Sequence, residues 1–352
     1  MTVRRTRRRN ANAVTIHDVA RKAGVSPMTV SRVTHGEVSV RESTRELVLS
    51  AIRELNYSPN PAAQSLAGAQ GTRIALIYSN PSMAYLSELL VGALEKAGRM
   101  AVQLVVEKWD NVKAAAERAA ARKLAGSVAG VILPPPLCES VPITAELASA
   151  GVPVVAVATG RFRANVCCVR IDDFRAASEM TAYLIGLGHT RIGFIKGHPN
   201  QTASAQRFAG FQATMEESGL ALNPGYVQEG FFTYRSGLDA AQELLARKRP
   251  PTAVFASNDD MAAAVISVAH RRGLDVPRDL SVVGFDDTVT ATTVWPELTT
   301  IRQPIAAMAD AAVNLLVHKI RQKKGEVAPD TVDQLFAHEL VKRDSAAPPR
   351  KA

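Results

Sequence analysis

The sequence predicts an α/β protein in which an all-α helix-turn-helix headpiece precedes a two-lobed, doubly wound α/β body. Helical periodicity fills the start of the chain, short apolar runs alternate with amphipathic helices beyond Thr72, and positive charge gathers at the N-terminal end. A length of 352 residues exceeds what one hydrophobic core usually organises. The expected parts are a disordered arm (1–13), the headpiece (14–59), a hinge helix and linker (60–71), the body (72–343) and a disordered tail (344–352).

The N-terminal arm is rich in arginine. Up to residue 70 the chain carries eleven Lys and Arg against five Asp and Glu, so most of the formal net charge of +9 lies in the first fifth. Such an asymmetry indicates that a polyanion binds at that end. The arginines of the arm taken alone are also consistent with a solvated tail.

The headpiece begins with two predicted helices. Apolar side chains in residues 15–23 recur at i, i+3, i+4 and i+7, and Gly24 ends this first helix. Ser26 is a good N-cap and Pro27 suits the first helical position, so a second helix is expected to continue over 28–34. Two helices joined by a turn of this length form a helix-turn-helix.

A third helix is expected to close the small core of the headpiece. Ser39 with Glu42 has the pattern of a capping box, and an apolar stripe at helical spacing follows. The stripe consists of Val48, Ala51, Ile52 and Leu55.

The second helix has an outward face suited to the major groove of DNA, where each base pair shows a distinct pattern of donors and acceptors. Pro27, Met28 and Arg32 point outward if Val30 and Val33 pack inward. We expect Arg32 to read a guanine through O6 and N7, a contact worth about 1–3 kcal/mol of discrimination. A phosphate contact or a solvated surface arginine are the alternatives.

Five stretches of the headpiece carry a specific resemblance. They are Thr15 to Ala20, Ala23 to Ser26, Thr29 to Val33, Thr44 with Arg45, and Asn56 to Asn60. Together they resemble the headpiece of the lactose-repressor and galactose-repressor (LacI/GalR-type) family of bacterial transcription regulators, and the resemblance continues through nearly the whole chain. It implies binding to double-stranded operator DNA. The implied DNA contacts in the headpiece are Thr15, Ser26, Pro27, Met28, Thr29, Ser31 and Arg32.

The linker has the composition of a short helix that folds only when held. Its helix-forming residues after Pro61 make about two turns, and isolated helices shorter than about 12–15 residues are marginal in water. The resemblance implies a hinge helix that pairs with its copy in a second subunit and enters the minor groove, with contacts from Asn60, Ala63 and Leu66. Leu66 matches a wedge that kinks DNA. A plain interdomain linker with Leu66 packed on the core is the alternative.

The body alternates predicted strands and helices. Most strand candidates are continuous apolar runs, as in parallel strands covered on both faces, so repeated β-α-β units and doubly wound sheets are expected. The strand candidates are 73–78, 102–106, 130–133, 153–158, 169–171, 192–196, 253–257 and 280–285. The helices between them include 86–97, 177–187, 204–218, 236–247 and 261–272.

Two lobes with crossovers near Val169 and Thr300 leave a cleft between them. Ligands bind beyond the carboxyl ends of strands in open α/β sheets, and Asn258 and Asp286 each follow a predicted strand directly. Helix capping and turn formation are the structural alternatives for such residues. The resemblance implies a body of the periplasmic-binding-protein type that closes around a small effector.

The resemblance also implies which residues bind that effector. Arg207 matches an arginine that grips the ligand, Asp286 its acidic partner, and Asn258 and Gln303 match pocket or hinge positions. Phe232 is expected as an aromatic floor, although Phe231 or Tyr234 are equally suitable. Helical phase places Arg207 at the edge of an apolar stripe, which is compatible with the cleft and with solvent.

Several classes of function find no support in the sequence. No His or Cys ligand spacing, nucleophile elbow or phosphate loop occurs, so we expect no metal, no cofactor and no catalysis. Cys138, Cys167 and Cys168 are not a disulfide framework, and we interpret the adjacent pair as buried small side chains rather than a redox switch. Neither a signal peptide nor a membrane span is apparent, so a cytoplasmic protein is expected.

The chain also departs from the lactose repressor. Ala158 stands where that protein has an acidic sugar contact, and Pro134 to Pro136 fill a loop that is more polar there, so its galactoside specificity is not carried over. No leucine heptads follow Arg343, which argues against a tetramer held by a coiled coil. A homodimer is expected, because twofold protein symmetry mirrors twofold DNA half-sites.

We therefore interpret the chain as a dimeric, sequence-specific transcription regulator, most simply a repressor, that is controlled by a small sugar or related metabolite. The effector releases DNA or is needed to hold it, depending on which state it binds more tightly. A solute-binding protein of a transport system is one rival interpretation. An α/β enzyme that uses Arg207, Asp259 and Asp286 is the other.

Overall fold

The computed structural model describes residues 14–34, 40–55, 57, 72–109, 113–160, 166–322 and 331–350. The chain forms two units, residues 1–71 and 72–352. The predicted arm and hinge helix, with Asn60, Ala63 and Leu66, lie outside the described residues. What the sequence predicts for them stays a prediction.

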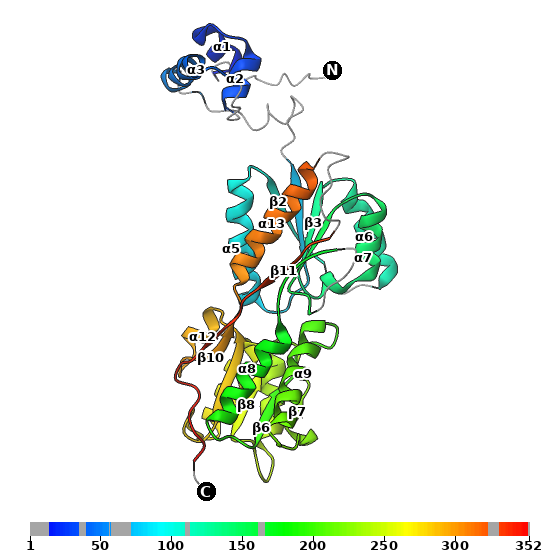
Figure 1. Cartoon of the computed structure of the whole chain (residues 1–352), viewed down its shortest axis with the longest axis vertical. Helices are drawn as coiled ribbons and strands as arrows, with labels where there is room; N and C mark the ends of the chain where they lie inside the picture. The colour runs from blue at the N-terminus through cyan, green and yellow to red at the C-terminus, as the bar shows by residue number, and fades with distance from the viewer. Residues whose placement is uncertain are drawn as a thin grey trace, which may run out of the picture. The chain divides into compact units, whose positions relative to one another are not determined.

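The headpiece consists of three helices around a small core, as predicted (Figure 1). They are α1 (Ile16–Ala23), α2 (Pro27–Thr34) and α3 (Glu42–Glu54). Ser26 caps α2 by accepting the Thr29 N–H at 3.2 Å, and Gly24 takes the left-handed conformation that ends α1. The N-cap position of α3 is occupied by Arg41, whose side chain makes no capping hydrogen bond, and Ser39 of the predicted capping box lies outside the described residues. The buried core consists of Val19, Ala20, Val30, Val33, Val48 and Ala51.

The first lobe of the body is a six-stranded parallel sheet in the order β11-β5-β4-β3-β1-β2. Helices cover both faces, α5 with α13 on one and α6 with α7 on the other (Figure 1). The strands are β1 (Arg73–Tyr78), β2 (Gln103–Lys108), β3 (Gly130–Leu133), β4 (Val154–Val157), β5 (Cys167–Ile171) and β11 (Asp333–Phe336). The helices are α5 (Met83–Arg99), α6 (Ala114–Ala125), the 3₁₀ turn η1 (Leu137–Glu139), α7 (Val141–Ser149) and α13 (Ile305–Arg321).

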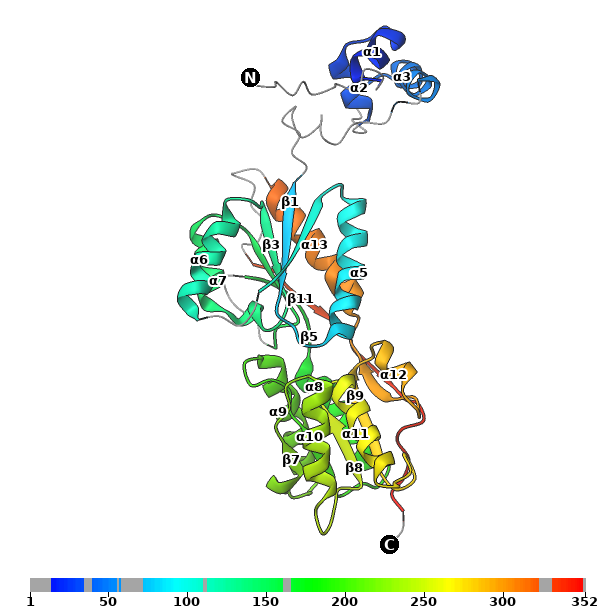
Figure 2. The same ribbon diagram turned by 180° about the vertical axis from the view of Figure 1, so that it is seen from behind.

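The second lobe repeats this plan with a sheet in the order β12-β10-β9-β8-β6-β7, in which only β12 runs antiparallel to its neighbour. Helices α8 and α9 pack on one face and α10 and α11 on the other (Figures 1 and 2). The strands are β6 (Ile192–Ile195), β7 (Val227–Gln228), β8 (Ala253–Ala256), β9 (Ser281–Asp286), β10 (Thr299–Arg302) and β12 (Glu339–Val341). The helices are α8 (Asp173–Gly186), α9 (Thr202–Glu217), η2 (Pro224–Tyr226), α10 (Tyr234–Leu245), α11 (Asp259–Arg271) and α12 (Val289–Thr293).

Three connections join the lobes, one more than the sequence predicts. The chain crosses after β5, after β10 and again between β11 and β12. The third crossing has little signal in the sequence because β11 and β12 are short, largely exposed strands at the sheet edges. Arg170 of β5 holds β11 through two hydrogen bonds to Asp333, at 2.8 and 2.6 Å.

Residues 344–350 of the predicted disordered tail (344–352) pack on the second lobe, whereas residues 351 and 352 lie outside the described residues. Ser345 is fully buried, accepts the Thr299 N–H at 2.8 Å and donates to the Val282 carbonyl at 2.6 Å. Further along, the Ala347 carbonyl accepts a hydrogen bond from Nε2 of buried His189 at 2.9 Å. The small, proline-rich composition resembles a tail, but the segment 344–350 is fixed by backbone partners in the second lobe.

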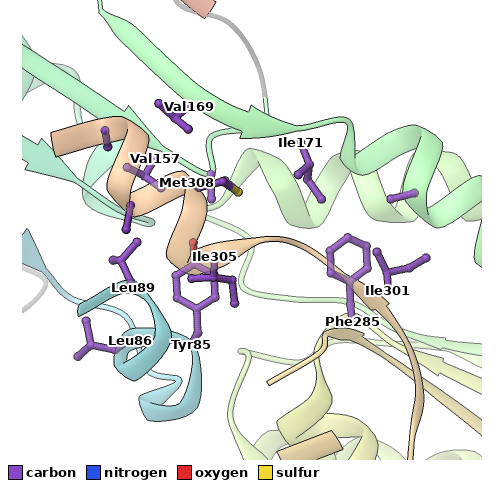
Figure 3. Close-up of a cluster of buried hydrophobic side chains, with 14 of the residues drawn as sticks. Tyr85, Leu86, Leu89, Val157, Val169, Ile171, Phe285, Ile301, Ile305 and Met308 are labelled. Atoms are coloured by element: carbon purple, nitrogen blue, oxygen red, sulfur yellow. The ribbon is translucent and has the colours of Figure 1, made fainter. Parts of the chain in front are cut away.

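The main hydrophobic core extends along the crossovers from one lobe into the other. Figure 3 shows Leu89 and Met308 of the first lobe, Ile171 at the end of β5, and Phe285 and Ile301 side by side on β9 and β10 of the second lobe. The side chains of all five are buried. The crossover strands are therefore anchored at both ends, and the space between the lobes lies beside them.

Candidate functional site

The outer face of α2 has the side-chain distribution that the sequence predicts. Met28 is 65% exposed and Arg32 is exposed, whereas Val30 and Val33 are buried against α1 and α3. Pro27 is half-buried at the start of the helix. A rigid helix that presents an arginine in this way has the form of a major-groove reader.

Three of the hydroxyl residues predicted to contact DNA, Thr15, Ser26 and Thr29, lie at helix starts, whereas Ser31 lies in the middle of α2. Thr15 precedes α1 and donates to the Asp18 carboxylate at 2.6 Å, while the Ser26 hydroxyl lies 2.9 Å from that of Thr29. Thr29 and Ser31 are half-buried in α2. Helix N-termini offer backbone N–H groups to anions. The starts of α1 and α2 can therefore bind phosphate oxygens as well as their capping side chains.

A pocket lies between the lobes, at the carboxyl ends of their strands, with a cavity volume of about 30 Å³ that opens to solvent. The first lobe contributes Asn80, Ser82, Tyr85, Pro135 and Ala158, and the crossover after β10 contributes Gln303. The second lobe contributes Gln201, Ala203, Arg207, Phe232, Asn258 and Asp286. The five residues that the sequence predicts as ligand contacts are all in this set.

Arg207 of α9 is the central cation of the pocket. It is 5% exposed, its Nε donates to Asp173 at 2.8 Å, and its Nη1 donates to the Ser257 carbonyl at 2.6 Å. Its guanidinium carbon lies 3.5 Å from the centre of the Phe285 ring. The sequence is compatible with Arg207 in the cleft or in solvent, and the structure shows it in the cleft. The hydrogen bonds to Asp173 and Ser257 fix the orientation of its guanidinium plane.

Asp286 faces Arg207 across the pocket. Its Oδ1 lies 3.6 Å from Arg207 Nη1 and accepts a 2.6 Å hydrogen bond from Gln303 Nε2. Burial raises the pKa of Asp286 to about 7, although the charge of Arg207 and the Gln303 hydrogen bond act in the opposite direction. The carboxyl group can therefore accept or donate a hydrogen bond near neutral pH.

Asn258 and Phe232 form the wall of the pocket in the second lobe. Asn258 caps α11 by accepting the Met261 N–H at 3.0 Å, and its amide donates to the Phe232 carbonyl at 3.1 Å. Asn258 therefore acts as a helix cap and also lines the pocket. Phe232 is 7% exposed, whereas the alternatives Phe231 and Tyr234 are 46% and 45% exposed.

Three buried polar atoms of the pocket lack a hydrogen-bond partner within the described residues. They are the hydroxyl of Tyr85, Nε2 of Gln201 and Oε1 of Gln303. Leaving such a group unpaired costs about 1–3 kcal/mol, so together they define a complementary set of ligand atoms. Burial raises the pKa of Tyr85, which keeps its hydroxyl protonated.

Sequence reasoning missed Asn80, Ser82, Tyr85, Gln201 and Ala203 as pocket residues, and it named Ala158 and Pro135 only as differences from the lactose repressor. Asn80 and Ser82 follow β1, Pro135 follows β3, and Gln201 comes after β6. The rule that ligands bind beyond strand ends, which identified Asn258 and Asp286, identifies these loops as well once the strands are known.

The pocket also concentrates unusual backbone conformations. Ala158, Phe232 and Asp286 have φ values of 52°, 59° and 111°, and Asp287 beside the pocket has 57°. Non-glycine residues with positive φ are uncommon and cost of order 1–3 kcal/mol each. The surrounding fold maintains this strain at the residues that shape the pocket.

Asp259, a catalytic candidate of the enzyme interpretation, does not line the pocket. Its carboxylate is 1% exposed and accepts hydrogen bonds from the Thr288 N–H at 2.8 Å and from the Thr300 hydroxyl at 2.7 Å. Burial and the charge of Asp286 raise the pKa of Asp259 well above its usual value. Asp259 therefore connects α11 to β10 and does not face a substrate.

Among the described residues, no three His, Cys, Asp or Glu side chains are arranged to hold a metal ion. The three cysteines are buried free thiols. The helices of the described ranges include none with the length and apolar character needed to cross a bilayer.

Family models match both parts of the chain. Residues 15–60 match the bacterial regulatory proteins of the lacI family, and residues 181–346 match a periplasmic binding protein-like domain. Catabolite control protein A of Priestia megaterium is 36% identical over 304 residues, which cover 86% of this chain and 91% of that protein. The transcriptional repressor PurR of Haemophilus influenzae is 35% identical and covers 88% of this chain and 92% of its own length.

Solved structures of regulators superpose on nearly the whole chain. A complex of the transcriptional regulator CelR with cellobiose has a TM-score of 0.70 and 32% identity, and the match covers 94% of this chain and 99% of that one. The Lac repressor dimer bound to operator and the anti-inducer ONPF has a TM-score of 0.76 and 28% identity, covering 96% and 100%. The relatives are regulators rather than enzymes, in agreement with the sequence prediction. The chain is a DNA-binding transcription regulator controlled by a small-molecule effector, and it belongs to the lacI family of bacterial regulatory proteins.

Proposed function

We propose that the chain represses transcription by binding an operator, and that an uncharged, hydroxyl-rich small molecule in the pocket between the lobes controls this binding. A sugar or related metabolite fits this description. The observation that carries the proposal is the convergence of Arg207, Asp286 and three unpaired hydrogen-bonding groups in one buried pocket. The relatives act as regulators, which favours the cytoplasm as the place of action.

The charge of the pocket favours an uncharged ligand. Arg207 and Asp286 are the only lining side chains of ionic type in the described residues, and each lies close to the other. Asp173 takes a further hydrogen bond from Arg207, so no cation remains uncompensated for a phosphate or carboxylate. Gln201 offers a donor, Gln303 an acceptor and Tyr85 both, which suits hydroxyl groups.

Operator contact is proposed for α2, with Arg32 reading a base and Met28 packing against base edges. Thr15, Ser26 and Thr29 would hold phosphates at the starts of α1 and α2, and Ser31 is a further proposed contact in the middle of α2. Asn60, Ala63 and Leu66 remain proposed minor-groove contacts of the hinge. The relative that was solved with operator is a dimer, which supports a dimeric form for this chain.

An exposed apolar surface supports the proposed homodimer. On α5, Met83, Val91 and Leu94 are 65%, 51% and 54% exposed, and Val106 of the neighbouring edge strand β2 is 39% exposed. Large contiguous apolar surfaces on soluble domains usually mark an interface. A second copy of the chain is the proposed occupant, and Leu94→Glu is expected to yield a monomer in sedimentation experiments.

The proposal is tested in two steps with the full chain. Duplexes are first selected from a random DNA pool, and gel shifts then measure preference for the selected sequence. A panel of neutral sugars, sugar phosphates and nucleosides is next screened by thermal shift, where a ligand at a hundred times its Kd stabilises by about 2.7 kcal/mol. A neutral polyol that raises Tm and changes operator affinity supports the proposal. Selection without enrichment, or stabilisation by phosphorylated compounds alone, contradicts it.

A further inference from the structure

The two lobes are joined by polar contacts in addition to the three crossovers. A carboxylate lies at the centre of each of two such groups, Asp260 in one and Glu139 in the other. Both carboxylates bind hydroxyl groups from the opposite lobe. Neither Asp260 nor Glu139 lines the pocket, but each binds a residue in a segment that does.

The first group, called the Asp260 clamp, consists of Ser82, Asp260 and Thr290. The Ser82 hydroxyl of the first lobe donates to Asp260 Oδ2 at 2.7 Å, and Thr290 of α12 donates to Asp260 Oδ1 at 3.1 Å. Ser82 lines the pocket and also caps α5, where it accepts the Tyr85 N–H at 3.3 Å. The Asp260 clamp therefore connects α11 and α12 of the second lobe to the loop that positions Tyr85.

The second group, called the Glu139 clamp, consists of Glu139, Thr159 and Thr202. The Thr202 hydroxyl at the start of α9 donates to Glu139 of η1, and the Thr159 hydroxyl reaches the same carboxylate oxygen at 3.2 Å. Thr202 lies between Gln201 and Ala203, which both line the pocket. The Glu139 clamp thus joins the ends of β3 and β4 to the start of α9.

Gly160 makes the tightest backbone contact beside the Glu139 clamp. Its N–H donates to the Thr202 hydroxyl at 3.0 Å. A Cβ atom at Gly160 would lie 2.4 Å from the Ala203 nitrogen and 2.5 Å from the Thr202 carbonyl carbon, which is closer than side chains tolerate. The lobes can therefore approach to this distance only because residue 160 has no side chain.

We infer that Asp260 and Glu139 are positioning residues that hold the lobes together around the pocket and thereby set the affinity for the effector. The role as an effector site rests on the proposed function, whereas the role in lobe closure does not. Hydrogen bonds to a charged group are stronger than neutral ones, and loss of one such bond changes a two-state ratio by roughly tenfold or more. The apparent Kd for the effector rises as the fraction of chains with closed lobes falls. Loss of both clamps is therefore expected to weaken effector binding by a larger factor than loss of one.

Lobe separation is measured without any ligand. Nitroxide labels at Arg118→Cys on α6 and Glu243→Cys on α10 report the distance between lobes by pulsed electron resonance, with labelled chain diluted into unlabelled chain. Both positions are exposed, whereas the native cysteines are buried. The double variant Glu139→Ala/Asp260→Ala and the single variant Gly160→Ala are compared with the parent. We expect both to gain a population with a changed, broader distance distribution.

Matched controls separate closure from general damage. Asp239→Ala removes an exposed carboxylate of α10, and Gly98→Ala adds a Cβ that meets no atom within 4 Å. Both are expected to keep the parent distribution. The double variant Glu139→Ala/Asp260→Asn retains an acceptor for Ser82 and is expected to restore part of the closed population that Glu139→Ala/Asp260→Ala loses.

Unchanged distances in both clamp variants, in protein that is still folded by circular dichroism, would overturn the inference. If the distances change but the chain binds none of the screened compounds, the role of the clamps in lobe closure is supported and the proposed effector site is refuted. If a neutral polyol binds the parent and both clamp variants equally well, the clamps do not set affinity and the inference is wrong. Effector binding that is weaker than in the parent by about tenfold or more supports the inference.

Discussion

The headpiece and the body place their functional side chains in opposite environments. The headpiece buries six small apolar side chains and presents Met28 and Arg32 on its surface. The body buries its functional side chains, so that Arg207 and Asp286 are each 5% exposed and Asn258 is 1% exposed. DNA is a partner that a surface can reach, whereas a small molecule must be enclosed to be recognised.

This difference determines how function and stability are related in each region. An exposed side chain contributes little to folding, so its replacement is expected to change binding alone. A buried ion pair leaves an uncompensated charge when one partner is removed, so its replacement changes both binding and folding. Mutations in the two regions should therefore separate into two classes.

Arg207→Ala is expected to give the largest effect, because it leaves Asp173 and Asp286 buried without their cation. Loss of one partner of a buried pair costs about 3–5 kcal/mol. Urea denaturation of the body should show this loss, whereas Arg235→Ala, which removes an exposed arginine of α10, should stay within about 0.5 kcal/mol of the parent. Equal stability of Arg207→Ala and the parent would refute the assignment of a buried pair.

Ser345→Val tests the ordered C-terminal segment. The substitution removes the acceptor of the Thr299 N–H and the donor to the Val282 carbonyl, so a loss of about 1–3 kcal/mol is expected. Ser149→Ala, which removes an exposed hydroxyl on α7, serves as the control. A body that tolerates both changes equally would mean that segment 344–350 is dispensable for stability.

Arg32→Ala should affect binding without affecting folding. We expect it to remove about 1–3 kcal/mol of preference for the selected operator over a scrambled duplex. The Tm of the chain should change little, since Arg32 is exposed. Arg21→Ala, on α1, is the control that should leave sequence preference intact. Equal loss of affinity for both duplexes in Arg32→Ala would indicate a phosphate contact instead.

The smallest expected effect is a pH dependence that originates at His189. Burial lowers the pKa of His189 below its usual 6.5, so the unfolded chain takes up a proton that the folded chain refuses as pH falls. Stability is therefore expected to fall below about pH 6.5, by at most about 1.4 kcal/mol per pH unit from this group. Denaturation at pH 7.5 and 5.5 should show a weaker pH dependence for His189→Gln than for the parent, whereas His270→Gln, at an exposed position, should match the parent.

The sequence predicts the parts of the fold that depend on local patterns. Helix periodicity and the caps at Ser26 and Gly24 define α1 and α2, and apolar runs define the central strands of both sheets. The strand-end rule leads to Asn258 and Asp286 because their strands, β8 and β9, are buried and easy to recognise.

Features that depend on long-range partners could not be predicted. Strands β11 and β12 are short and largely exposed, and β11 pairs with β5, which lies more than a hundred residues away in the sequence. Ser345 looks like part of a tail until the acceptor and donor groups of Val282 and Thr299 are known. The two clamps and the unpaired atoms of Tyr85 and Gln201 are likewise relations between distant segments.

The central claim is that occupation of the buried pocket in the body changes the grip of the headpiece on DNA. The most direct measurement titrates the compound identified by thermal shift into the free chain and into the chain saturated with its selected operator. Linkage requires that the two affinities differ by the same factor by which the compound changes operator affinity, and a coupling of about 1–3 kcal/mol corresponds to about 5–150-fold. We expect such a factor in the parent chain and its disappearance in Arg207→Met. Equal affinity of the compound for the free and the operator-bound chain would contradict it.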